Sequence, residues 1–318
     1  MPKVRKSAFD IDLQKLVGPL RILSYLISKP WGVKMLHSSS YFTKGQRIKD
    51  LRNEECYIPS RNDGPDIRIR IFRPDTEEIL PALLYIHGGG YLIGIPEISL
   101  NVIEQYIKRR KCVVVAVDYR KGLKHGYPDG FNDCYDTLLW MKENAESLNI
   151  RSDKFVVGGH SAGGGLTAAV TLKACDKGDV NLAFQMPIYP MIDCRQNTES
   201  AKAMDKGVPT WNAKSNKLGW KTYLQNIEGE IPTYASPALS TKFNHLPPTI
   251  TFVGELEPFK DETITYVESL KSAGVPVKFE LFEKAYHAFE TTDSKADVSK
   301  RANRFQYEAW EQFYDKYL

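Results

Sequence analysis

One serine stands in a pattern that would expose it for nucleophilic attack. The sequence Gly159-His160-Ser161-Ala162-Gly163 follows an apolar run typical of a buried strand and precedes a stretch typical of a helix. This spacing predicts a nucleophile elbow, a sharp strand-to-helix turn that presents the hydroxyl of Ser161. Glycines on both sides remove side chains that would collide in so tight a turn. Because the same pattern also arises in ordinary glycine-rich loops, the interpretation depends on chemical partners elsewhere in the chain.

A glycine triplet after another apolar run could bind an anion. In His87-Gly88-Gly89-Gly90, no Cβ blocks the approach of a ligand to the backbone N–H groups. The phosphate-loop pattern Gly-x-x-x-x-Gly-Lys-Ser/Thr is absent, and the triplet does not fit the dinucleotide-binding pattern. We therefore predict an oxyanion hole, in which the N–H groups of Gly88, Gly89 and Ala162 converge on a carbonyl attacked by Ser161. A flexible turn is the alternative.

Of the six histidines, His287 has the best position for a general base. It lies downstream of Ser161 and just past the last apolar run, where a loop can return it to the strand ends. His87 belongs to the glycine loop, His160 adjoins the serine on the wrong side of the elbow, and the other three histidines lie in polar loops. A lone histidine in a loop is more often structural. The argument for His287 therefore depends on its location after Ser161 and beyond the last predicted strand.

The acid that orients such a histidine should lie between the serine and the histidine in sequence. The stretch after the apolar run 250–253 supplies several carboxylates. We favour Glu257, with Glu255 and Asp261 as rivals. Asp261 has a second explanation, because it precedes a helical stretch and could be its N-cap.

Short apolar runs and helical stretches alternate along the chain and predict the scaffold that would hold these residues. Such runs are typical of parallel strands buried on both faces, so the expected fold class is α/β, with a mostly parallel central sheet flanked by helices. Alternating isoleucine and arginine over 66–71 predict a half-exposed antiparallel edge strand. The apolar strands are expected at 82–86, 113–117, 155–157, 183–188, 250–253 and 277–282. The helices are expected at 97–110, 131–144, 166–174, 261–273 and 301–316.

Two further segments have no place in this sheet and predict a helical cap. Residues 8–36 hold apolar positions at helical spacing, with a break expected at Gly18-Pro19, and residues 194–234 contain large aromatic side chains but no strand signal. The expected organisation is an N-terminal helical cap segment (1–45), a first core part (46–193), a cap insertion (194–233) and a second core part (234–318).

Composition and charge exclude several classes of function. The 43 basic and 39 acidic residues leave a net charge of +4 without a long basic stripe, so no nucleic-acid partner is expected. Charged residues interrupt the apolar segment 13–31 well short of a membrane span, and no signal-peptide core follows the basic start of the chain. The 5 cysteines, an odd number without CxxC spacing, predict free thiols and a cytoplasmic location.

Taken in order, the motifs resemble those of the α/β-hydrolase superfamily. Within it they are similar to the hormone-sensitive-lipase-like group of bacterial carboxylesterases, which includes relatives of arylacetamide deacetylase. The resemblance covers about residues 67–289. The matching motifs are His87-Gly88-Gly89-Gly90-Tyr91-x-x-Gly94, Asp118-Tyr119-Arg120, Gly159-x-Ser161-Ala162-Gly163-Gly164, Tyr234-Ala235-Ser236-Pro237, Glu257-Pro258-x-x-Asp261-Glu262 and His287-x-Phe289.

Three positions depart from the family pattern. The residue before Ser161 is usually aspartate but is His160 here. The position of Glu257 also usually holds aspartate, so a longer side chain must reach His287. The usual Leu-Ala-Pro-Glu after the Asp-Tyr-Arg motif is replaced by the loop Lys121-Gly122-Leu123-Lys124, which predicts a difference near the acyl pocket. None of these changes removes a chemically required group.

The resemblance implies an α/β-hydrolase fold with a helical cap and a serine ester hydrolase that acts on short- to medium-chain acyl esters. The implied roles are nucleophile for Ser161, base for His287, orienting acid for Glu257, and oxyanion hole for Gly88, Gly89 and Ala162. The expected partner is a small-molecule acyl ester, with no metal or organic cofactor, and a homodimer is left open. The alternatives are an amidase or deacetylase with the same machinery and, more remotely, a non-catalytic ligand-binding protein on the same fold.

Overall fold

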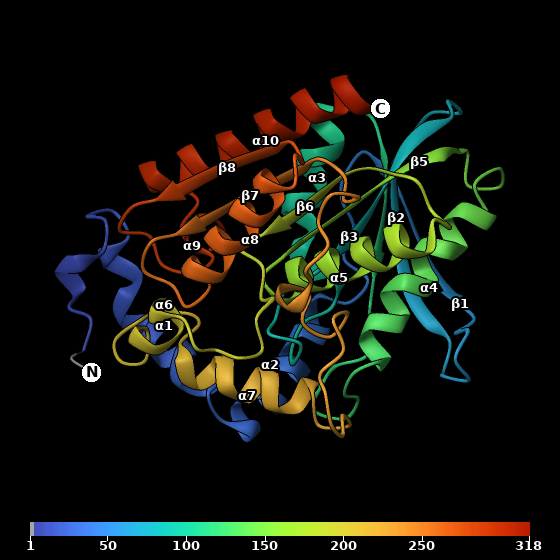
Figure 1. The fold of residues 1–318 in the computed structure, drawn as a ribbon. Coiled ribbons are helices and arrows are strands. Elements are labelled where there is room, and N and C mark those ends of the chain that lie inside the picture. The colour runs from blue at the N-terminus through green and yellow to red at the C-terminus, as the bar shows by residue number, and fades with distance from the viewer. Residues whose placement is uncertain (1–2) are drawn as a thin grey trace.

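An eight-stranded sheet forms the centre of the computed structural model, which describes residues 3–318 (Figure 1). The strand order is β1-β2-β4-β3-β5-β6-β7-β8, in which β2 runs antiparallel to both neighbours and the remaining pairs are parallel. The strands are β1 (Leu51–Ile58), β2 (Ile67–Pro74), β3 (Leu80–Ile86), β4 (Val113–Val117), β5 (Ile150–His160), β6 (Leu182–Ile188), β7 (Thr249–Gly254) and β8 (Val277–Phe282). The predicted mostly parallel α/β sheet is confirmed.

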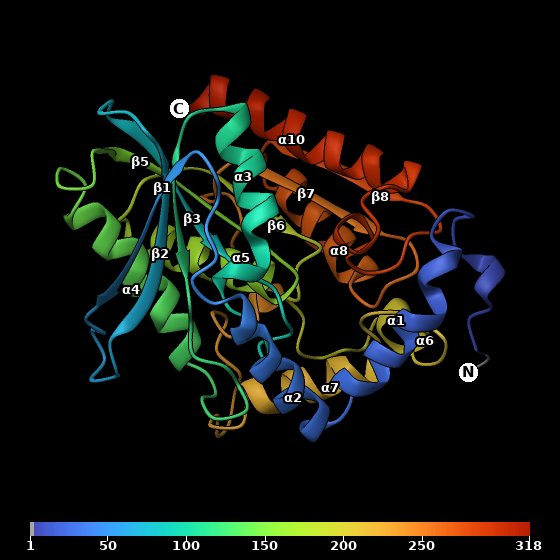
Figure 2. The same cartoon turned by 180° about the vertical axis from the view of Figure 1, so that it is seen from behind.

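Helices cover both faces of this sheet. α3 and α10 pack side by side on one face (Figure 2), and α4, α5 and α8 pack on the other. A strand such as β4 is therefore buried along its whole length and must be apolar on both sides. The α-helices are α1 (Gln14–Ile27), α2 (Pro30–Ser40), α3 (Leu100–Arg109), α4 (Asp129–Glu143), α5 (Ala162–Lys177), α6 (Glu199–Ala203), α7 (Ala213–Tyr223), α8 (Lys260–Ser272), α9 (Phe289–Thr292) and α10 (Asp297–Tyr317). Short 3-10 helices are η1 (Lys6–Ala8), η2 (Tyr41–Thr43), η3 (Pro96–Ser99) and η4 (Pro237–Leu239).

The alternating segment 66–71 lies inside the sheet and not at its edge. It forms most of β2, which is buried along almost its whole length, while the polar strand β1 forms the edge. Arg68 and Arg70 are buried because both guanidinium groups pair with the buried carboxylate of Glu97. These ion pairs offset part of the cost of removing the charges from water. The prediction of a half-exposed edge strand was therefore wrong.

Several helices begin or end at other residues than predicted. α1 continues through Gly18-Pro19, and the break comes instead before Pro30, where Lys29 has the extended backbone that a following proline favours. Asp261 lies in the first turn of α8 and not at its N-cap, so the capping explanation for this residue was wrong. α5 begins at Ala162, directly after the predicted elbow.

The N-terminal helices and the segment between β6 and η4 lie together at one end of the sheet (Figures 1 and 2). α1 contacts α7, the amide of Asn212 donates a hydrogen bond to Ser24 Oγ at 2.5 Å, and Arg21 Nε donates to the carbonyl of Gly207 at 2.7 Å. The two predicted cap segments thus pack against each other. The domain boundaries themselves stay a prediction, and Met1 and Pro2 lie outside the described residues.

Candidate active site

Ser161 occupies the turn between β5 and α5. Its backbone has φ 59° and ψ −120°, a conformation that costs a non-glycine residue on the order of 1–3 kcal/mol. The surrounding backbone holds this turn, since the N–H of Ser161 donates to the carbonyl of Ile188 at 2.9 Å. A Cβ at Gly163 would lie 2.0 Å from the carbonyl oxygen of Ile86, so the close approach of β3 requires glycine there. The strained geometry is that of the predicted elbow.

The structure brings Ser161, His287 and Glu257 into one hydrogen-bonded chain. Ser161 Oγ lies 2.9 Å from His287 Nε2, and His287 Nδ1 contacts Glu257 Oε2. The other carboxylate oxygen of Glu257 accepts the N–H of Gly254 at 2.9 Å. Because a carboxylate accepts the Nδ1 proton, Nε2 is left as the acceptor for the serine hydroxyl. All three side chains are buried.

Residues that the sequence analysis did not identify hold His287 in this orientation. The rings of Tyr189 and Phe259 meet the imidazole edge-on, with centroids at 4.8 Å and 5.0 Å. The hydroxyl of Thr210, from the predicted cap insertion, donates to the carbonyl of His287 at 2.7 Å. No local sequence pattern marks these three residues, because their roles arise from segments that meet only in the fold.

The two rival carboxylates point to other partners. Glu255 accepts the N–H of Lys284 at 2.8 Å, and Asp261 accepts the N–H of Ser200 at 2.7 Å. Burial alone would raise the pKa of Asp261, but the hydrogen bond from Ser200 and the charge of Lys260 lower it below the ordinary value. Among residues 3–318, neither rival forms a hydrogen bond with His287.

The glycine loop lies directly against the serine. A Cβ on Gly88 would be 3.4 Å from the Cβ of Ser161, and Gly89 has a φ of +126°, which side chains disfavour. Within the described chain, the N–H groups of Gly88, Gly89 and Ala162 donate no hydrogen bond to a protein acceptor. Three such donors around one nucleophile suit the developing charge of an oxyanion. That role stays a prediction.

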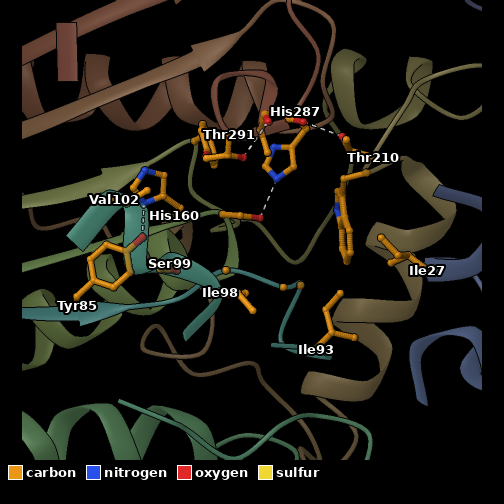
Figure 3. Close-up of a pocket in the computed structure, with 17 residues that line it drawn as sticks. Ile27, Tyr85, Ile93, Ile98, Ser99, Val102, His160, Thr210, His287 and Thr291 are labelled. Carbon is orange, nitrogen blue, oxygen red and sulfur yellow. Dashed lines mark hydrogen bonds between the residues drawn. The ribbon is translucent and has the colours of Figure 1, made fainter. Parts of the chain in front are cut away.

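Apolar side chains enclose Ser161 in a cavity of about 230 Å³ (Figure 3). Ile27 of α1 and Trp211, which precedes α7, line it from the cap segments, whereas Ile93, Ile98 and Val102 line it from the core. The predicted cap segments therefore form part of the wall around Ser161. Over residues 3–318, no group of three or more His, Cys, Asp or Glu side chains is arranged to hold a metal ion. In the same part of the chain no helix is long and apolar enough to cross a membrane.

Comparison with known proteins agrees with this fold. Residues 83–291 match the sequence model of a family described by the α/β-hydrolase fold. The chain belongs to the α/β-hydrolase family. Its resemblance to the hormone-sensitive-lipase-like branch of that family is also confirmed.

Relatives of this hydrolase include proteins named as esterases. It is 29% identical to esterase LipI of Mycobacterium tuberculosis, over 77% of this chain and 79% of that protein. It is 31% identical to carboxylesterase NlhH of the same species, over 74% of this chain and 75% of that protein. The solved structure of a bacterial heroin esterase has a TM-score of 0.87 and 31% identity, covering 96% of this chain and 98% of that one.

His160, the departure from the family pattern beside Ser161, forms an uncharged part of the pocket wall. Its Nε2 lies 3.3 Å from the amide oxygen of Gln306 and must donate to it, which leaves Nδ1 to accept from the hydroxyl of Tyr85 at 2.9 Å. Burial lowers the pKa of His160 to about 4, so the ring is uncharged near neutral pH. In the residues described, it makes no hydrogen bond with Ser161.

The altered loop 121–124 does not line the cavity at Ser161. The amine of Lys121 pairs with Asp118 at 2.7 Å, and the N–H of Gly122 donates to the carbonyl of Tyr91 at 2.7 Å. Leu123 and neighbouring residues face α2 across a separate hollow. The loop that differs from the family pattern therefore lies outside the wall of the cavity at Ser161.

A second buried carboxyl group lies close to His287. The hydroxyl of Tyr189 donates to Glu290 Oε1, and the side chain of Glu290 is buried. Burial raises the pKa of Glu290 to about 7, although the hydrogen bond from Tyr189 acts in the opposite direction. Tyr189 thus connects Glu290 to the edge of the His287 imidazole.

Glu290 should make the stability of this hydrolase fall as the pH rises. Its folded pKa of about 7 lies above the ordinary glutamate value of 4.5, so the native state binds the proton more tightly than the unfolded state. This contribution is fully present below pH ~4.5 and is lost as pH rises through ~7, with a total of roughly 3 kcal/mol at about 1.4 kcal/mol per pKa unit. Between pH 5 and pH 8, the free energy of unfolding measured with denaturant should therefore fall more for the parent than for Glu290→Gln.

A matched control for this measurement is Glu283→Gln, which removes an exposed carboxylate a short distance earlier in the chain. We expect that variant to keep the pH dependence of the parent. Equal losses of unfolding free energy in the parent and in Glu290→Gln would mean that Glu290 is ionised in the folded protein throughout this range.

Proposed function

We propose that this chain is a serine carboxylesterase that hydrolyses short- to medium-chain acyl esters through an acyl-enzyme. The observation that carries the proposal is the chain of contacts from Ser161 Oγ to His287 Nε2 and from His287 Nδ1 to Glu257. The names of the relatives, which include carboxylesterase NlhH and esterase LipI, support the same reaction class.

In the first half of the proposed reaction, Ser161 Oγ attacks the ester carbonyl while His287 Nε2 takes the serine proton. Glu257 keeps the imidazole in the tautomer that can accept this proton, and its charge stabilises the imidazolium. The N–H groups of Gly88, Gly89 and Ala162 donate to the oxyanion. The carbon–oxygen bond to the alcohol then breaks, and the alcohol leaves with the proton from His287.

In the second half, a water molecule attacks the acyl-serine carbonyl and passes a proton to His287. The tetrahedral intermediate collapses, Ser161 regains its proton from the imidazolium, and the carboxylic acid is released. Every proton moves between the substrate, water and these side chains, so the cycle requires no further group.

The dimensions of the pocket support short acyl groups. Its volume of about 230 Å³ falls below the ~300–1,000 Å³ of typical ligand sites. Trp211 and Ile27 limit it from the cap side. We propose that residues 1–45 and 194–233 act as this cap. The five free cysteines support a cytoplasmic location, and a homodimer stays a prediction.

The proposal is tested with p-nitrophenyl esters from acetate to palmitate and with the anilide matched to the best ester. We expect kcat/KM to be highest for acetate to hexanoate and to fall steeply for longer chains, because the cap side closes the pocket. Turnover of the anilide at a rate equal to or above that of the ester would favour an amidase. Absence of turnover for the whole series would contradict the proposed function and favour a binding protein.

A further inference from the structure

The catalytic cavity shares a wall with a larger surface hollow, which we call the α3–α10 groove. This groove has a volume of about 650 Å³ and lies between α3, α9 and the first half of α10. Its polar lining includes Asn101, Gln105, Ser294, Asn303, Arg304 and Glu308. Ile98, Val102 and Thr291 line both the groove and the catalytic cavity. Since Ile98 is 48% exposed and Thr291 is also exposed, the two spaces meet at the surface over these side chains.

The chemistry of the proposed reaction decides which part of an ester faces the groove. The leaving alcohol must take its proton from His287 Nε2, so it must lie on an open side of that imidazole. Figure 3 shows Thr291, Val102 and His160 on one side of His287, and Thr210 and Ile27 on the other. The second side is closed by the cap segments, so the alcohol leaves towards Thr291 and the groove.

The charges of the groove do not select an ionic ligand. Its basic side chains are Arg109, Lys300 and Arg304. Its carboxylates are Glu104 and Glu308, because the raised pKa of Glu290, about 7, leaves that group partly protonated near neutral pH. Arg109 pairs with Glu311 at 3.2 Å and Lys300 with Asp297 at 2.8 Å, which neutralises part of the basic set. A net field that would attract an anion or a cation is therefore missing from the lining that the structure describes.

Hydrogen-bonding groups dominate the remaining lining. Amide side chains such as Asn101 and Gln105 both donate and accept, and in the described chain neither hydrogen-bonds to another residue. Glu290 forms part of the inner wall, where its Oε2 is buried and has no hydrogen-bond partner among the described residues. Leaving a buried acceptor unsatisfied is costly. Because this oxygen has almost no exposed surface, the amides are the groups that a ligand in the groove meets first.

We propose that the α3–α10 groove binds the alcohol part of the substrate, and that this alcohol is a neutral polyhydroxylated group such as a sugar ring that carries the acyl ester. The amides of the groove bind its hydroxyl groups, and the exposed side chain of Ile98 contacts its C–H face. This inference rests on the proposed function and adds the class of alcohol.

Three acetate esters test the inference on the intact protein. Methyl 6-O-acetyl-glucopyranoside and cyclohexylmethyl acetate both release a primary alcohol attached to a six-membered ring, and only the first has ring hydroxyls. p-Nitrophenyl acetate reports the ester chemistry without a matching alcohol. We expect kcat/KM for the sugar acetate to exceed that for cyclohexylmethyl acetate by about tenfold or more, which corresponds to about 1.4 kcal/mol.

In the double variant Asn101→Leu/Gln105→Leu, the ratio of kcat/KM for the sugar acetate to that for cyclohexylmethyl acetate should fall close to one. Gln312→Leu, on α10 but outside the groove, should keep the preference of the parent. Hydrolysis of p-nitrophenyl acetate without a preference for the sugar ester would overturn the groove assignment and leave the proposed function intact. A preference that survives the double variant would also overturn it. Failure to hydrolyse any of the three esters would overturn the proposed function and the groove assignment with it.

Discussion

Replacing Ser161 with alanine is expected to reduce ester turnover by a factor on the order of 10⁴ to 10⁶. The hydroxyl 2.9 Å from His287 Nε2 is the group that forms the acyl-enzyme in the proposed mechanism. Without it, only the oxyanion donors and the pocket remain to assist direct attack by water. The measurement is kcat/KM for p-nitrophenyl acetate, with active-site labelling by a phosphonate ester as a second readout.

Ser99→Ala is the matched control, because Ser99 lines the same cavity without contacting His287. We expect it to stay within about tenfold of the parent and to react with the phosphonate. Ser161→Ala should not react, and it should keep the parent's unfolding midpoint because alanine retains the same backbone strain. A variant at Ser161 that kept a tenth of the parent's turnover would show that another group is the nucleophile.

The sequence predicted correctly those parts of the fold that are determined by residues close together in the chain. Val113–Val117 is apolar at every position because helices cover β4 on both faces. The unbroken apolar run alone therefore indicates a buried strand. The elbow is likewise local, since the glycines flanking Ser161 are required by the approach of Ile86 and its neighbours. Both features could be predicted without knowing which segments pack against them.

The wrong predictions concern elements whose structure depends on contacts with distant residues. The alternation of Arg68 and Arg70 has the period of a half-exposed strand, but carboxylates elsewhere in the sequence pair with both guanidinium groups and permit their burial. Glu97 pairs with both arginines, and Glu55 and Asp118 pair with Arg68. The start of α5 was also missed, because three consecutive glycines at 163–165 disfavour a helix. A Cβ at Gly165 would lie 2.1 Å from the carbonyl oxygen of Met191, so close packing requires the glycine whatever its helix propensity.

Tyr189, Thr210 and Glu290 could not have been assigned for the same reason. Tyr189 follows β6, Thr210 belongs to the predicted cap insertion, and Glu290 lies on α9. Each reaches His287 or its neighbour through a contact between segments that are far apart in the chain. A sequence pattern can mark Ser161 and His287 as candidates, but the groups that contact the imidazole are visible only once the chain is folded.

Exchanging Glu257 for glutamine should reduce kcat/KM by a factor of about 10³ to 10⁴ while the fold and the reactive serine remain. Glutamine can still accept from the N–H of Gly254, so the loop after β7 should keep its shape. It can also donate to His287 Nδ1, which would stabilise the wrong tautomer, and it lacks the charge that stabilises the imidazolium. Glu257→Asp should be much milder, because the carboxylate survives and only its reach is shorter.

The neighbouring carboxylates provide matched controls for Glu257→Gln within the same loop and helix. Glu255→Gln weakens the acceptor for the N–H of Lys284, and Asp261→Asn weakens the acceptor for the N–H of Ser200, so both changes act at a distance from the imidazole. We expect each to retain turnover within about tenfold of the parent, with Asp261→Asn lowering the unfolding midpoint slightly. If Asp261→Asn proved inactive while Glu257→Gln stayed active, the acid of the triad would be Asp261. The contact between Glu257 and His287 would then serve only to hold the loop in place.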